Sequence, residues 1–233
     1  MADGAPPSPN PMDAAGHRAR LRQKLLQSGG GALADYEIIE YLLALAIPRR
    51  DTKPLAKALL REFGSMGGLI NAEPEALSAM KGMGETSVAA IKIVQAAMQR
   101  MLAGEISGKK ALGSWQALLD YLRADMAFSL NERVRVLHLD TQNRLIRDEI
   151  MAEGTIDQAA IHPREIIRRA LAIGSAAIII VHNHPSGDPS PSKQDILMTR
   201  ELAESAKRLG ISLHDHVIIG REGHSSLKSL GLF

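Results

Sequence analysis

Apolar residues change their spacing near the middle of the chain. From Arg18 to about Leu102 they recur every three or four positions, as in the stretch from Tyr36 to Ala46, which is typical of amphipathic helices. Later, residues 133–140 alternate polar and apolar positions, and Ala176 to Val181 form a continuous apolar run. These are the patterns of a half-buried and a buried strand. The sequence therefore predicts an all-α domain followed by an α/β domain with a central mixed sheet.

Composition sets the expected domain boundaries. Residues 1–16 are small, polar and proline-rich, and predict a disordered tail. A helical domain over 17–103 is followed by a linker at 104–113, which contains glycines and paired lysines, and by a second domain over 114–233. Local signals predict further features: N-caps at Asp35 and Thr52, a helix from Pro163 to Gly174, a helix from about Asp195 to Gly210, and a last short strand at Val217 to Gly220.

Length and residue usage narrow the class of protein. A chain of 233 residues favours two domains. It contains no cysteine, so disulfides are excluded and any metal site must use histidines and carboxylates. The first residues lack the basic and apolar segments of a signal peptide, and no apolar run approaches membrane-spanning length. We therefore expect a soluble cytoplasmic protein without a membrane partner.

The net charge of +2 is unevenly distributed. Residues 17–110 hold 14 Lys and Arg against 9 Asp and Glu, whereas residues 111–233 hold 14 against 15. A mildly basic first half is compatible with phosphate contacts, but it is weaker than the charge typical of polyanion-binding proteins.

The candidate chemistry lies directly after the apolar run 176–181. His182 and His184 are one residue apart, and Asp195 follows eleven positions after His184 in a proline-rich loop. Two imidazoles and a carboxylate suit zinc, and three protein ligands leave a fourth position for water, as in catalytic sites. The pattern predicts a catalytic zinc site.

Two structural alternatives compete with this prediction. The spacing Ser192-x-x-Asp195 is also typical of a helix start, with Ser192 capping the first turn. A second pair, His214-x-His216, has no proline-braced loop and is predicted to be structural, at the edge of a strand.

Four of these residues together resemble the JAMM motif of MPN-domain metalloproteases: His182, His184, Ser192 and Asp195. The sequence around these residues, together with Asp215 to Gly220 downstream, resembles that of the RadC family. The resemblance implies an α/β MPN domain with a cytidine-deaminase-like fold. It also implies a zinc hydrolase in which activated water attacks the carbonyl of an unidentified peptide or protein substrate.

The family pattern also implies a glutamate base and an oxyanion donor. Glu132, just ahead of the alternating strand, occupies the matching place for the base, and Ser192 would donate to the oxyanion. Glu165 is the competing base, although a first-turn glutamate of a helix needs no catalytic explanation. Asn183 stands between the histidines where eukaryotic relatives usually carry serine, which is a difference outside the ligand set.

The helical half contains a second motif. Residues 80–91, with Gly82 and Gly84, resemble a helix-hairpin-helix element whose exposed amides hold a DNA phosphate. The alternative is a tight turn between packed helices. Two further functions therefore stay open: a DNA repair or recombination factor that binds the DNA backbone, and a metal-dependent nuclease.

Overall fold

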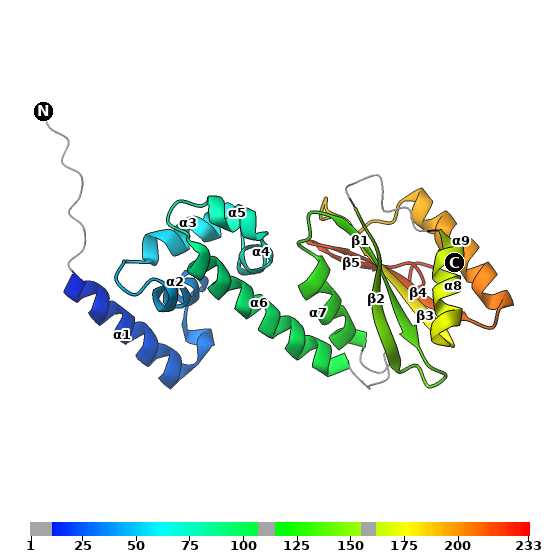
Figure 1. Ribbon diagram of the computed structural model, residues 1–233, viewed down its shortest axis with the longest axis horizontal. Helices are drawn as coiled ribbons and strands as arrows, with labels where there is room; N and C mark the ends of the chain where they lie inside the picture. Colours follow the sequence, from blue (N-terminus) through cyan, green and yellow to red (C-terminus); the bar gives the residue numbers. More distant parts are fainter. Residues whose placement is uncertain (1–10, 107–114, 155–161) are drawn as a thin grey trace, which may run out of the picture. The chain divides into compact units, whose positions relative to one another are not determined.

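The computed structural model describes residues 11–106, 115–154 and 162–233. The chain divides into two compact units between Ala96 and Ala97. The first unit is helical and the second is built on a five-stranded sheet (Figure 1). The predicted order, a helical domain followed by an α/β domain, is confirmed.

Helices extend into both predicted irregular segments. Helix α1 begins at Pro11, inside the predicted tail 1–16, because proline suits a first helical turn. Helix α6 continues to Ile106, inside the predicted linker 104–113, because Ile106 is buried in the core of the second unit. The remaining parts of both segments, residues 1–10 and 107–113, lie outside the described residues.

The first unit packs its helices around one apolar core. Its elements are α1 (Pro11–Ser28), a 3-10 turn η1 (Gly30–Ala32), α2 (Asp35–Ala46), α3 (Lys53–Phe63), α4 (Met66–Asn71), α5 (Pro74–Ala79) and the start of α6 (Glu85–Ile106). Leu43, Leu59 and Ile91 are fully buried at its centre. The six-residue helices α4 and α5 were not predicted, since they are too short for a helical period to stand out.

The two predicted N-caps differ in outcome. Thr52 is the N-cap of α3, but its hydroxyl donates to the carbonyl of Glu40 at 2.9 Å instead of capping its own helix. Asp35 is the first helical residue of α2, and Ala34 is the N-cap. Asp35 still lies where the helix dipole favours a negative charge.

The second unit contains a mixed sheet in the order β2-β1-β3-β4-β5. Its strands are β1 (Glu132–Leu139), β2 (Leu145–Gly154), β3 (Ala177–Asn183), β4 (Ser212–Gly220) and β5 (Gly223–Ser226). β3 and β4 are parallel, and the other neighbours are antiparallel. The predicted mixed sheet is confirmed, with the apolar run 176–181 forming most of its buried central strand.

Helices cover both faces of this sheet. Side chains of α7 (Trp115–Met126) pack against Ile179, Val181 and their neighbours on one face. Side chains of α8 (Pro163–Ile173) and α9 (Lys193–Arg208) pack against Ile178, Ile180 and their neighbours on the other. The alternation follows from the two-residue period of a strand. His182 therefore faces the same side as Ile178 and Ile180, toward α9.

The last part of the sheet is longer than predicted. β4 begins at Ser212 rather than Val217, and β5 was not predicted. The alternation of β4 is interrupted at His214, where a register shift against β3 leaves one extra residue. β5 consists of glycine, histidine and two serines, which have no apolar pattern.

Candidate metal centre

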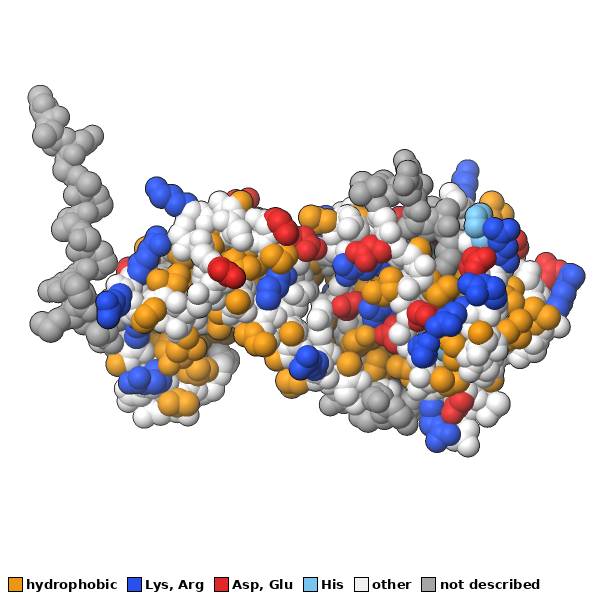
Figure 2. Space-filling view, viewed as in Figure 1, with side chains coloured by type: hydrophobic (Ala, Val, Ile, Leu, Met, Phe, Trp, Pro, Cys, Tyr) orange, Lys and Arg blue, Asp and Glu red, His pale blue; other side chains and the backbone are white. Residues whose placement is uncertain are grey.

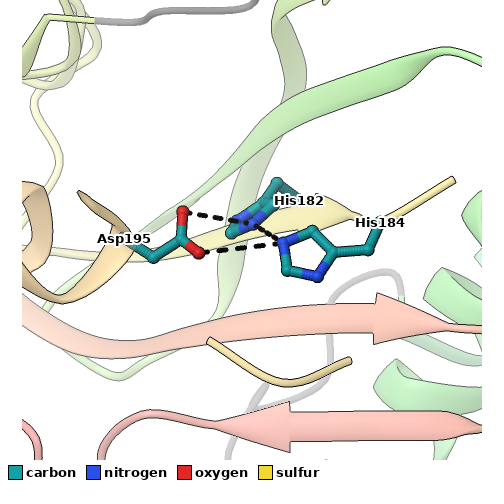
Figure 3. Close-up of side chains that lie close together, drawn as sticks. All are labelled: His182, His184 and Asp195. Atoms are coloured by element: carbon teal, nitrogen blue, oxygen red, sulfur yellow. Dashed lines mark hydrogen bonds and ion pairs between the residues drawn. The ribbon is translucent and has the colours of Figure 1, made fainter. Parts of the chain in front are cut away.

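The fold brings the three predicted ligands together at the end of β3. His182 is the second-last residue of that strand, and His184 directly follows the strand. Asp195 is in the first turn of α9. The three side chains point toward one another (Figure 3). The two Nε2 atoms are 3.0 Å apart, and the Asp195 oxygens lie 3.5 Å from His182 Nε2 and 3.7 Å from His184 Nε2.

These distances fit a metal ion. Atoms bound at about 2.0–2.2 Å to a tetrahedral zinc ion are themselves roughly 3.3 Å apart. The three observed separations bracket that value, and one ligand atom from each residue lies within 4.8 Å of the others. Two imidazole nitrogens that face each other beside a carboxylate also favour a shared cation. The residues present therefore form a group that could hold a metal.

The outer nitrogen of His184 has a partner of its own. His184 Nδ1 lies 2.9 Å from the carbonyl oxygen of Asp188. A carbonyl only accepts, so Nδ1 carries the hydrogen and the lone pair of a neutral ring stays on Nε2. A backbone carbonyl is a common partner for a metal-binding histidine.

Burial and charge set the protonation of the three groups. Burial lowers the pKa of His182 to about 4. The hydrogen bond with Asp195 raises the pKa of His184. Burial acts to raise the pKa of Asp195, but the hydrogen bond with His184 and the charge of His182 outweigh it, and the pKa is lowered. At neutral pH His182 is neutral and Asp195 is ionised, which are the forms that bind metals.

The loop between the ligands is held by the turn after β4. The Arg221 guanidinium donates to the carbonyl of Ser186 at 2.7 Å. Gly187 has a φ of 100°, which favours glycine. A Cβ at Gly220 would lie 2.2 Å from the Gly187 carbonyl oxygen, so the two backbones touch. This contact and the prolines of the loop restrain the segment between His184 and Asp195.

Glu132 is the first residue of β1. β1 pairs with β3 so that Val134 is opposite His182, and Glu132, two residues earlier, faces the same side of the sheet. Burial raises the pKa of Glu132, and the charges of His184 and Asp195 also act on this carboxyl group. The predicted base therefore shares the face of the sheet that carries His182.

Asn183 connects the ligand segment to the start of β1. Its Oδ1 accepts from the amide of Arg133 at 2.9 Å, and its Nδ2 donates to the carbonyl of Asn131 at 3.0 Å. The side chain is buried and spans the backbone on both sides of Glu132. The residue between the two histidines thus fixes the backbone that carries the predicted base.

Ser192 has the geometry of a helix cap. Its hydroxyl oxygen accepts from the amide of Asp195 at 3.1 Å, and an Asp195 carboxylate oxygen accepts from the amide of Ser192 at 2.7 Å. This geometry matches the structural alternative, in which Ser192 caps the first turn of the helix. A hydroxyl that accepts in this way still has its hydrogen to donate, so the cap does not compete with an oxyanion role.

The competing base, Glu165, has an ion-pair partner of its own. Glu165 is in the first turn of α8 and forms an ion pair with Arg168 at 3.0 Å. Its side chain is 42% exposed. These are the surroundings of a surface residue on an amphipathic helix.

The hairpin of the first unit joins α5 and α6. Gly82 has a φ of 100°, as a tight turn requires. The Arg50 guanidinium covers this turn, since a Cβ added to Gly82 would lie 2.8 Å from Arg50 Nη2. The amide of Gly84 is already occupied, since it donates to the Ser87 hydroxyl at 2.8 Å. Of the two glycines predicted to bind phosphate, Gly82 has the cationic Arg50 as a neighbour. The amide of Gly84 already donates its hydrogen within the protein.

Two residues that the sequence did not assign to the site lie directly behind it. His216 is fully buried in β4, with its Nε2 2.8 Å from His182 Nδ1, and Thr199 of α9 contacts the other nitrogen of His216. The pair His214-x-His216 was predicted to have a structural role, and neither residue was assigned to the metal site. No local sequence signal identifies His216, because its contact with His182 depends on the pairing of β4 with β3.

A five-stranded mixed sheet with His-x-His at the end of its central strand, followed by an aspartate in the next helix, has the architecture of a JAB or MPN domain. The comparison with protein families agrees: the RadC-like JAB domain matches residues 112–232, and the UPF0758 N-terminal domain matches residues 13–89. The chain belongs to the RadC family, as its motifs indicated.

One further finding concerns membranes. Among the helices of the described ranges, none combines the length and apolar character needed to cross a bilayer.

Proposed function

We propose that this protein is a zinc-dependent hydrolase of the JAMM type that cleaves an amide bond, either peptide or isopeptide. One observation carries the proposal: two imidazole nitrogens and a carboxylate converge within 4.8 Å, and the half-buried Glu132 lies on the same face of the sheet as His182. Membership of a family with a JAB domain supports the same chemistry.

Zinc is the metal proposed for this site. The ligands would be His182, His184 and Asp195, a set that zinc uses in hydrolases, and no cysteine is present to favour a softer ion. When bound, zinc supplies Lewis acidity that lowers the pKa of water and polarises a carbonyl group.

The chain's own residues would move the protons. Glu132 accepts a proton from the attacking water and passes it to the leaving amine as the carbon–nitrogen bond breaks. Its pKa, raised by burial, is closer to neutrality than that of an exposed glutamate and suits both transfers. The Ser192 hydroxyl hydrogen is free to donate to the oxyanion that forms on the substrate carbonyl.

The first experiment is the metal content of purified protein by elemental mass spectrometry, for wild type, His184→Ala and Asp195→Ala. We expect about one zinc per chain in wild type and loss of zinc in both variants, with circular dichroism unchanged. Wild type that stays metal-free when offered zinc would overturn the proposal. A metal-loaded protein then justifies a search among peptide and isopeptide substrates, with Glu132→Gln as the inactive control.

Contact with a DNA backbone through the first unit is the second candidate. The observation in its favour is the exposed Arg50 guanidinium over the Gly82 turn. Against it, Gly84's amide is occupied, and the blue basic side chains on the visible face of the first unit are separated by hydrophobic and uncharged surface (Figure 2). Arg50→Ala removes the charge without straining the turn, so loss of salt-dependent DNA binding in this variant would support the candidate.

A nuclease would use the same ligands on phosphorus. DNA nicking by wild type that disappears in Asp195→Ala would favour that reaction over amide hydrolysis. Absence of nicking by zinc-loaded protein would exclude it.

A further inference from the structure

A line of buried polar groups lies behind His182 and returns to Asp195. His182 Nδ1 is 2.8 Å from His216 Nε2, and His216 Nδ1 is 2.5 Å from Thr199 Oγ1. The Thr199 hydroxyl also bonds the backbone carbonyl of Asp195 at 2.5 Å. The three side chains are almost inaccessible to solvent, with exposures of 2% for His182 and 0% for His216 and Thr199.

The last acceptor and the burial of His216 together determine the direction of the bonds in this line. The Asp195 carbonyl can only accept, so the single hydroxyl hydrogen of Thr199 points to it. Thr199 Oγ1 must then accept from His216 Nδ1–H. Burial disfavours a charged imidazole, so a neutral His216 has its lone pair on Nε2.

The consequence for His182 follows directly. His216 Nε2 accepts, so His182 Nδ1 carries the hydrogen of its ring, and His182 Nε2 has the lone pair that faces His184 and Asp195. Had the line run in the other direction, the hydrogen of His182 would lie on Nε2 and block a metal.

We propose that His216 and Thr199 are positioning residues that hold His182 in the tautomer able to bind a metal through Nε2, and that they connect this proposed ligand to the backbone of the other, Asp195. The proposal rests on the proposed metal binding. His182 comes from β3, His216 from β4, and Thr199 with Asp195 from α9, so one line of bonds spans the three elements that must be in register for the site to exist.

Thr199→Val and Thr199→Ser separate this role from simple packing. Valine keeps the branched shape but has no hydroxyl, whereas serine keeps the hydroxyl. Loss of a residue that orients a metal ligand typically weakens metal binding about 10- to 100-fold. In competition of the full-length protein with a chromophoric chelator for Zn²⁺, we expect that loss for Thr199→Val and near-wild-type affinity for Thr199→Ser and for the matched control His214→Gln.

The tautomer itself can be measured on the metal-free wild-type protein. With ¹⁵N-labelled histidine, two-bond nitrogen–proton correlations report which nitrogen of each ring carries the hydrogen. We expect His182 and His216 both to be protonated on Nδ1. His182 protonated on Nε2, or Thr199→Val that folds and binds Zn²⁺ as tightly as wild type, would overturn the proposal.

Failure of the proposed hydrolase gives a different result. Wild type with no affinity for Zn²⁺ would remove the proposed function, while the tautomers in the metal-free protein would still test the direction of the bonds. Tight Zn²⁺ binding without any hydrolysis would leave the positioning role in place and remove only the reaction.

Discussion

Two His-x-His pairs lie on neighbouring parallel strands, and the fold uses them differently. His182 and His184, at the end of β3, bring both Nε2 atoms to within 3.0 Å of each other. In β4, the register shift at His214 directs that side chain to Asn143, 2.6 Å away, and leaves His216 against His182. Identical spacing gives a shared site only where the backbone keeps both side chains on one side. In β4, one extra residue separates them.

The sharpest test of this comparison is removal of one histidine from each pair. His184→Ala should weaken Zn²⁺ binding by more than roughly the 100-fold that the loss of a supporting residue costs, because a ligand itself is missing. His214→Ala should bind Zn²⁺ as wild type does, since its Nε2 contacts Asn143. Chelator competition measures both. Equal losses in the two variants would show that the second pair also holds the metal.

The backbone contact between Gly220 and Gly187, in the loop that follows His184, predicts that Gly220→Ala lowers the free energy of unfolding. The added Cβ would lie 2.2 Å from the Gly187 carbonyl oxygen, so the loop or the turn must shift. Overpacking of this kind costs about 1–3 kcal/mol. Trp115, the single tryptophan, packs in the second unit and reports its urea unfolding by fluorescence.

Gly104→Ala provides the matched control. Gly104 is helical and has nothing within 4 Å of an added Cβ, so alanine there should leave stability unchanged or raise it by up to about 1 kcal/mol. A Gly220→Ala variant as stable as this control would mean that the loop yields without cost.

Asn183→Ala tests how the first pair is joined to Glu132. The change removes the partners of the Arg133 amide and the Asn131 carbonyl in a buried place, and should cost on the order of 1 kcal/mol in the free energy of unfolding. Because no ligand is altered, Zn²⁺ affinity should change far less than in His184→Ala. An unchanged free energy of unfolding would indicate that water takes the place of the Asn183 side-chain amide.

The smallest expected effect is the pH dependence contributed by His214. Burial lowers its pKa below 6.5, so the unfolded chain binds more protons than the folded chain as the pH falls. Its contribution to stability is present above pH 6.5 and is lost as the pH falls below that value. Between about pH 7.5 and 5.5, the free energy of unfolding measured in urea should therefore fall less for His214→Gln than for wild type. A greater loss in the variant would contradict the assigned sign.

The candidate metal ligands were predictable because their signal is local. The apolar run 176–181 identified the buried strand, and His182, His184 and Asp195 follow it within one loop and one helical turn. The alternative for Ser192, a helix cap, is also encoded within four residues, and its geometry is present in the structure.

His216 and Thr199 were not predictable in the same way. Their contact with His182 depends on the register of β4 against β3 and on where α9 crosses the sheet, and both arise from pairing between distant segments. The bulge at His214 hides the alternation of β4, and the polar composition of β5 gives no strand pattern. Local periodicity reports which face a residue takes, but not what it meets there.

The contact between Gly187 and Gly220 also bears on how the candidate site folds. The three proposed ligands lie close together in the sequence, yet the strand and turn that hold their loop come later in the chain, with β4 and Arg221. The loop reaches its folded shape only when β4 is paired with β3. The geometry of the candidate site therefore forms together with the sheet and not ahead of it.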